Sequence, residues 1–143
     1  MKKLFFLLFF IPALSCQPQP SEKDQKDKLE TRVMAVHDDA MAEMDRIYKL
    51  RKELRRLQDT LSTRQTDSTT LKKLSRHGLL LQQADEGMMD WMRRYKAPSA
   101  AMPHDSAMQY LKQQLHKIER VQTRIDSTIT AAEKIIKEYE DQK

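Results

Sequence analysis

The chain has 143 residues, of which 33% are charged, and it contains two glycines, one tryptophan and one cysteine. A charged, glycine-poor chain without strand-like alternation predicts long helices and excludes a sheet-based domain. One cysteine excludes an intramolecular disulfide. The formal charge of +5 is a small surplus over 143 residues and does not indicate a polybasic nucleic-acid-binding protein.

The first fifteen residues are typical of a signal peptide. Lys2 and Lys3 precede an apolar stretch, LFFLLFFIPAL (4–14), which is shorter than the ~20 residues that a membrane-spanning helix needs. The stretch ends in "ALSC", which resembles a bacterial lipoprotein signal with Cys16 as the acylated first residue of the mature chain. Ala13 and Ser15 also fit ordinary cleavage after small residues, so simple secretion is the alternative.

A short flexible tether, lipidated at Cys16, is predicted for residues 16–27, because this stretch contains two prolines and no apolar side chain after the cysteine. Residues 28–143 are then one domain. Removing Lys2 and Lys3 from the 26 basic residues leaves 24 against 21 acidic ones, so the mature chain carries a formal charge of +3.

A first helix is predicted from about residue 22 to 62, because apolar side chains recur at heptad spacing with Glu43 as the one polar position. These positions are Leu29, Val33, Val36, Ala40, Glu43, Ile47, Leu50, Leu54, Leu57 and Leu61. Residues 62–70, STRQTDSTT, favour turns and helix caps, and Asp67 or Ser68 is expected to cap the next helix.

A second helix is predicted over about 68–96, and its apolar face is weaker. That face carries Leu71, Leu74, Leu81, Met88, Met92 and Tyr95, and it also includes Gly78 and Asp85. Residues 97–103, APSAAMP, end this helix because Pro98 and Pro103 disfavour helix just before them.

A third helix is predicted over about 104–141, again with one polar position in its heptad seam, Gln122. The seam reads Met108, Leu111, Leu115, Ile118, Gln122, Ile125, Ile129, Ala132, Ile136 and Tyr139. Three long helices with short breaks predict an all-α, antiparallel up-down-up three-helix bundle with coiled-coil-like seams. A coiled coil that forms only by oligomerising is the alternative.

Pairing the predicted helices about their two breaks brings all the methionines of the mature chain to one end. The candidate binding residues gathered there are Met34, His37, Met41, Met44, Met88, Trp91, Met92, His104 and Met108, joined by Tyr95, Met102 and Tyr110. Methionine fills irregular core gaps, so the plain interpretation is core packing, with His37 bonded to an aspartate of a neighbouring helix. The alternatives are a Cu(I) or Ag(I) site of thioether and imidazole ligands, and a patch left open for a protein partner.

Catalytic signatures are absent from the sequence. It contains no glycine-rich phosphate loop, no G-x-S-x-G, no H-E-x-x-H and no E-x-x-H. We therefore expect no enzyme, no cofactor and no committed metal site. Nucleic acid is not an expected partner of an exported protein; the membrane, through the N-terminal lipid, and an envelope protein are.

Three segments, VMAVHDDAMAEM (33–44), ADEGMMDWM (84–92) and residues 110–135, together resemble a small family of uncharacterised helical lipoproteins from Bacteroidota, often labelled "viral A-type inclusion protein". This resemblance spans most of the mature chain. It implies a helical fold and an address in the cell envelope, as an outer-membrane lipoprotein on the periplasmic face or the cell surface. It implies no catalytic residue.

Overall fold

The computed structural model describes residues 20–63 and 67–140, which form four helical segments and their connections. The segments are α1 (Glu22–Ala42), α2 (Met44–Thr63), α3 (Ser68–Arg94) and α4 (His104–Glu140). These residues contain no strand, and the helices pack against one another, so the predicted all-α class is confirmed. None of the four segments is both long and apolar enough to cross a membrane. The lipidation site predicted at Cys16 lies outside the described residues.

Helix α1 begins at a capping box. The Ser21 hydroxyl accepts from the Asp24 backbone N–H at 3.1 Å, and the Asp24 carboxylate accepts from the Ser21 N–H at 3.2 Å. Two otherwise free backbone donors are thereby bonded, and Lys23 pairs with Asp27 one turn on, at 2.6 Å. Residues 22–27 are therefore helical, and the flexible tether predicted for 16–27 does not extend over them.

The helix predicted as continuous from 22 to 62 is interrupted at Glu43. This residue has ψ −7°, whereas an α-helix has ψ of about −42°. Its N–H bonds to the Ala40 carbonyl, three residues back, at 3.2 Å, and the Ile47 N–H then bonds to the Glu43 carbonyl at 3.0 Å. The chain thus makes one tightened turn and continues as helix, and the interruption lies at the one polar position of the predicted seam.

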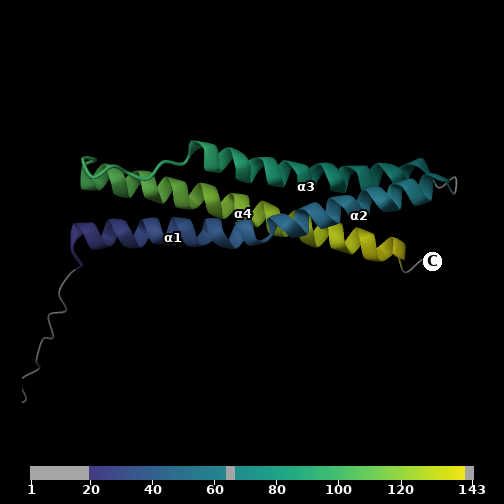
Figure 1. The fold of residues 1–143 in the computed structure, drawn as a ribbon, viewed down its shortest axis with the longest axis horizontal. Coiled ribbons are helices and arrows are strands. Elements are labelled where there is room, and N and C mark those ends of the chain that lie inside the picture. Colours follow the sequence, from purple (N-terminus) through teal and green to yellow (C-terminus); the bar gives the residue numbers. More distant parts are fainter. Residues whose placement is uncertain (1–19, 64–66, 141–143) are drawn as a thin grey trace, which may run out of the picture.

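The helical segments before and after this interruption, α1 and α2, pack mainly on different helices. Figure 1 shows α1 lying along α4, while α2 crosses α4 and continues beside α3. Helices α3 and α4 also contact each other, and in the half that contains α2 the Tyr139 hydroxyl of α4 lies 3.4 Å from the Thr70 hydroxyl of α3. Helix α1 therefore packs mainly on α4, whereas α2 packs mainly on α3 and also contacts α4.

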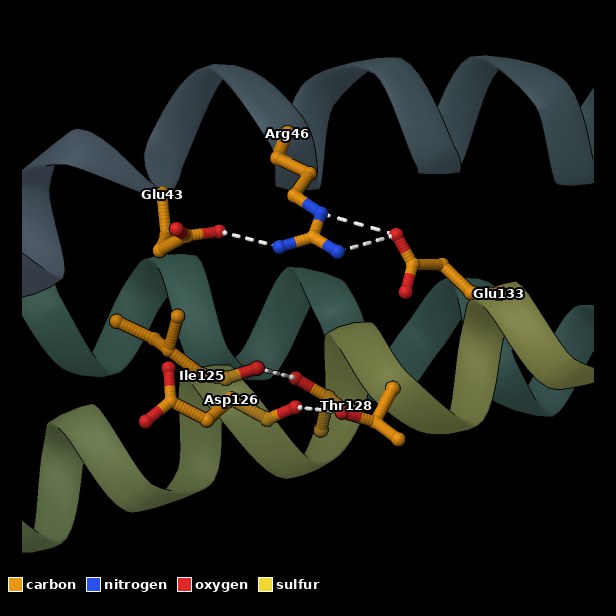
Figure 2. Close-up of polar contacts among 7 residues, drawn as sticks. Glu43, Arg46, Ile125, Asp126, Thr128 and Glu133 are labelled. Atoms are coloured by element: carbon orange, nitrogen blue, oxygen red, sulfur yellow. Dashed lines mark hydrogen bonds and ion pairs between the residues drawn. The ribbon is translucent and has the colours of Figure 1, made fainter.

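One arginine ties the interrupted region to α4. The Arg46 guanidinium donates to the Glu133 carboxylate at 2.6 and 2.9 Å and to the Glu43 carboxylate at 3.2 Å. Figure 2 shows the guanidinium lying between these two carboxylates, one from the interruption and one from α4. Because all three side chains are partly exposed, this arrangement fixes geometry more than it stabilises the fold.

Many of the apolar side chains named for the first and third predicted helices are buried in the core. Fully or nearly fully buried are Val33, Ala40, Ile47, Leu54 and Leu57 on α1 and α2, and Leu111, Leu115, Ile118, Ile125, Ile129, Ala132 and Ile136 on α4. The polar seam residue Gln122 is half-buried. These side chains make up most of the buried core of the described residues.

The apolar face of α3 differs from the predicted one. Leu74, Leu81 and Met88 are buried as expected, and the next buried positions after Leu81 and after Met88 are Ala84 and Trp91. The face therefore does not include Asp85 and Met92, and Met92 is 40% exposed. A three-residue step and a four-residue step both keep a side chain near the same helical face, and packing on α4 selects the three-residue step after Leu81 and after Met88.

Both connections lie where the sequence predicted them. Asp67 is the N-cap residue of α3, and α3 ends at Arg94 before the proline-containing segment 95–103. Pro98 is buried, and the Pro103 carbonyl accepts from the Ala107 N–H at 3.0 Å, which starts α4. The burial of Pro98 and this hydrogen bond fix the path of the connection between the two helices.

Candidate binding site at the methionine- and aromatic-rich end

Four rings from three helical segments lie in sequence at the end of the molecule where α1 begins. The His37 and Trp91 ring centroids are 5.5 Å apart, with a tilt of 33°. Trp91 stacks on Tyr95 at 4.8 Å, and Tyr95 lies 6.4 Å from Tyr110. We call these four residues the aromatic stack. Its geometry places His37 of α1 level with Trp91 of α3.

The end of α3 positions two members of the stack. Tyr95 has an extended backbone with ψ 133°, and its N–H bonds to the Trp91 carbonyl at 2.8 Å. Helix geometry ends there, and the Tyr95 ring remains one turn from Trp91. The Tyr110 hydroxyl accepts from the Lys96 backbone N–H at 3.1 Å, so it binds the start of the connection to α4.

Two buried polar atoms in the stack have no hydrogen-bond partner within the described residues: Trp91 Nε1 and the Tyr95 hydroxyl oxygen. Burial raises the pKa of Tyr95 to about 12, and the nearby charge of Glu30 adds to the shift. A buried donor without a partner is unfavourable by about 1–3 kcal/mol, so such atoms are uncommon and often mark a site for water or a ligand. The stack therefore offers two donors to an incoming acceptor.

His37 is the one imidazole in the stack. Its side chain is 15% exposed, and its Nδ1 lies 2.8 Å from the Asp38 carboxylate. The aspartate partner is therefore the next residue of the same helix, and the expectation of an aspartate from a neighbouring helix is wrong. With Nδ1 held by Asp38, Nε2 is the ring nitrogen left for another partner.

The methionines separate into core and surface groups. Met88 is fully buried, and Met41 and Met44 pack partly buried against the core. Met34 is half-buried on α1. Met92 was expected in the core, but it is 40% exposed; Met89 is 39% and Met102 37% exposed.

His104 and Met108 lie in the first two turns of α4, and both are half-buried. Met108 lines a shallow hollow formed by α4 residues alone, which include Lys112 and His116. The structure thus brings His37 and Trp91 into direct contact with each other, while Met108 faces a different surface. Among the described residues, no three His, Cys, Asp or Glu side chains are grouped closely enough to hold a metal ion.

One half-buried histidine with a buried ring nitrogen was not anticipated from the sequence. His77, on α3 in the half opposite the aromatic stack, has a buried Nδ1 without a partner in the described part of the chain. Burial lowers the pKa of His77, and neighbouring Arg76 adds to the shift, while Glu138 opposes it. A three-residue step from Leu74 reaches His77, whereas the four-residue step used in the prediction reaches Gly78. This spacing was the signal that could have placed His77 beside the core.

Comparison with protein-family models, with curated proteins and with solved structures finds no match to this chain.

Proposed function

We propose that this chain is a lipid-anchored protein of the cell envelope, with a structural or partner-binding role and without catalysis. The observation that carries the binding role is the exposed methionine group: Met89 and Met92 on one face of α3, and Met102 in the following connection. Flexible, polarisable methionine side chains suit an adaptable protein interface. Met92 follows Trp91 directly in the chain, and Met102 lies in the connection that begins at Tyr95, so the group is close in sequence to two members of the aromatic stack.

The architecture that we propose for this role is an antiparallel up-down-up three-helix bundle with coiled-coil-like seams. Helices α1 and α2 together form the first arm, α3 the second and α4 the third. Support comes from α4, where buried or half-buried side chains recur at alternating intervals of four and three residues from Leu111 to Ala132. Such a rod offers long, solvent-facing surfaces and holds its ends apart.

A photo-crosslinking experiment tests the binding role. A photoreactive amino acid replaces Met92 in one variant and Tyr48 in the other, because Tyr48 is an exposed apolar side chain on α2, at 66%. Irradiation of intact cells should yield one discrete adduct from position 92 and none from position 48. The proposal fails if position 92 gives no adduct or if both positions give the same ones.

A Cu(I)- or Ag(I)-binding protein is the second candidate function. The Asp38 carboxylate on His37 Nδ1 is the arrangement that orients many metal-binding imidazoles, and it leaves Nε2 as the ligand atom. Met41, one turn on, is the nearest thioether in sequence. A stoichiometric Cu(I) titration that disappears in the His37→Ala, Met41→Ala variant supports this function. A melting temperature that Cu(I) leaves unchanged contradicts it, because a ligand of the folded state raises that temperature.

A further inference from the structure

A groove runs between α3 and α4, lined only by residues of these two helices. It has a volume of about 480 Å³, and its walls come from residues 84–94 of α3 and 114–124 of α4. Small-molecule sites are typically about 300–1,000 Å³. We call this hollow the α3–α4 groove. Trp91 lines it, so the groove and the aromatic stack share one side chain.

The rim of the groove is strongly cationic. Arg94, Lys117, Arg120 and Arg124 line it, against one carboxylate, Asp90. That carboxylate already accepts from Arg94 at 3.0 Å and from Arg93 at 3.3 Å.

The three cations from α4 recur at one-turn spacing, so they lie along one face of the helix. Within residues 20–63 and 67–140, Lys117, Arg120 and Arg124 form no ion pair. Three neighbouring positive charges therefore lack a counter-charge, and an anion in the groove would relieve their repulsion.

The floor of the groove combines apolar surface with polar groups that lack partners. Ala84, Gly87 and Val121 supply the apolar part. Gln114 is 7% exposed and makes no hydrogen bond among the described residues. A methyl group on Gly87 would meet no atom within 4 Å, so the space above this glycine is open.

We propose that the α3–α4 groove binds a phosphate ester whose organic part is small and apolar. The doubly charged phosphate pairs with Lys117, Arg120 and Arg124. Each guanidinium group can donate two parallel hydrogen bonds to two phosphate oxygens, and the lysine ammonium adds a further positive charge. The apolar part lies over Gly87 and Val121, and the Gln114 amide bonds to a polar atom of the ligand. This site does not depend on the lipid anchor or on the exposed methionines, so it stands or fails separately from the proposed function.

Trp91 makes the test direct, since it is the only tryptophan in the chain and it lines the groove. Phenyl phosphate is titrated into the purified protein in phosphatidylcholine liposomes, followed by tryptophan fluorescence and by calorimetry. We expect saturation at one site per chain and weaker binding at higher salt. Absence of saturable binding by both methods overturns the proposal.

Two further titrations identify the source of the phosphate. Inorganic phosphate should bind more weakly than phenyl phosphate, because it lacks the apolar part. Liposomes that contain phosphatidic acid, whose headgroup is a phosphate monoester, compete with phenyl phosphate if the natural ligand is a lipid headgroup, and they leave its binding unchanged if the ligand is a free ester. Equal binding of inorganic and phenyl phosphate contradicts the apolar half of the site.

Two pairs of variants separate the groove from general charge attraction. The triple variant Lys117→Gln, Arg120→Gln, Arg124→Gln should raise the Kd for phenyl phosphate at least tenfold. Its control is Lys52→Gln, Lys73→Gln, Lys134→Gln, which removes the same charge from exposed positions outside the groove. An equal rise in both triples shows diffuse attraction and overturns the proposal.

The second pair fills space and leaves charge unchanged. Gly87→Leu places a side chain in the groove and should abolish binding, whereas Gly78→Leu, at the other open glycine of α3, should not. Circular dichroism confirms that each variant is folded. Unchanged affinity in a folded Gly87→Leu variant places the ligand elsewhere and contradicts the proposal.

Discussion

Two tyrosines of the aromatic stack are alike in packing and opposite in hydrogen bonding. The Tyr110 hydroxyl accepts from the Lys96 backbone N–H, whereas the Tyr95 hydroxyl is buried without a partner. Both rings are half-buried and stack at similar tilts. The pair therefore separates the contribution of a hydroxyl from that of its ring.

Removing each hydroxyl should shift stability in opposite directions. Tyr95→Phe relieves an unsatisfied buried group and should raise the free energy of unfolding by about 1 kcal/mol. Tyr110→Phe removes a bonded acceptor and should lower it by about 0.5–1.5 kcal/mol. Urea unfolding of the two variants against the parent protein measures both changes. A loss of stability in Tyr95→Phe would show that its hydroxyl has a partner.

His77 should make the fold sensitive to mild acid. Its pKa in the folded protein lies below the ordinary value, because burial disfavours the charged imidazole. As the pH falls through roughly 6.5, the unfolded chain binds a proton that the folded chain does not, so the free energy of unfolding decreases. The stabilising difference is complete above that pH and is lost as the pH falls through the folded pKa.

Unfolding measured at several values between roughly pH 7.5 and pH 5.5 tests this titration. The slope of stability against pH should be smaller in His77→Gln, which retains a polar side chain and cannot titrate. His116→Gln is the matched control, because His116 is exposed on α4. Equal slopes in the parent protein and the His77→Gln variant would contradict the assignment.

At the scale of single helices, α3 carries two glycines that packing does not require. A Cβ at Gly78 or Gly87 would meet no atom within 4 Å, and both residues lie inside the helix. Glycine in a helix interior is less favourable than alanine by about 1 kcal/mol. Gly78→Ala and Gly87→Ala should each raise the free energy of unfolding by about that amount.

The two alanine changes should also add, because the sites are distant and share no contact. Thermal and urea unfolding of the single and double variants measure this. A double variant no more stable than either single variant would mean that α3 does not unfold together with the rest of the protein.

Comparison of helices shows where sequence reasoning succeeded. Along α4, large aliphatic residues occupy nearly every seam position, so one helical face is far more apolar than any other and its burial is predictable. Along α3, Trp91 and Met92 are adjacent and both apolar, and the pattern alone does not decide between them. The structure buries Trp91, whose ring contacts His37 of α1 and Tyr95, and leaves Met92 40% exposed.

Other features depend on contacts that sequence spacing does not encode. The pattern placed Glu43 as a polar position in an unbroken seam, whereas the structure tightens the backbone there and bonds Glu43 to Arg46. Likewise, nothing in the sequence distinguishes Lys117, Arg120 and Arg124 from charged residues on the solvent-facing side of a helix. They become the wall of a groove only when α3 lies beside them.

For the whole molecule, length is the main geometric fact. The 37 residues of α4 correspond to about 55 Å of helix, at about 1.5 Å per residue. Helix α1 begins at the end of the molecule where α4 also begins, and α2 ends at the other end (Figure 1). On our proposal a lipid at Cys16 holds the start of α1 nearer the membrane and the end of α2 farther from it.

The anchor is tested at the mature N-terminus. Mass spectrometry should find a chain that begins at Cys16 with two or three acyl groups. Cys16→Ala should release the protein from membranes or leave the precursor uncut, whereas Ser21→Ala, which alters the α1 cap, should leave the protein in the membrane fraction. An unmodified Cys16, or a chain that begins elsewhere, would exclude lipid anchoring.

Because α1 packs mainly on α4 and α2 mainly on α3, α1 can detach without α2. Only Val33 and Ala40 of the 21 residues in α1 are buried, whereas ten residues of α4 are. Because α1 has so few fully buried side chains of its own, this segment should open at a lower free energy than the rest. Amide hydrogen exchange should be fastest in α1 and should change rate near Glu43. A pull exerted through the N-terminus would then peel α1 away first and leave α2, α3 and α4 packed together.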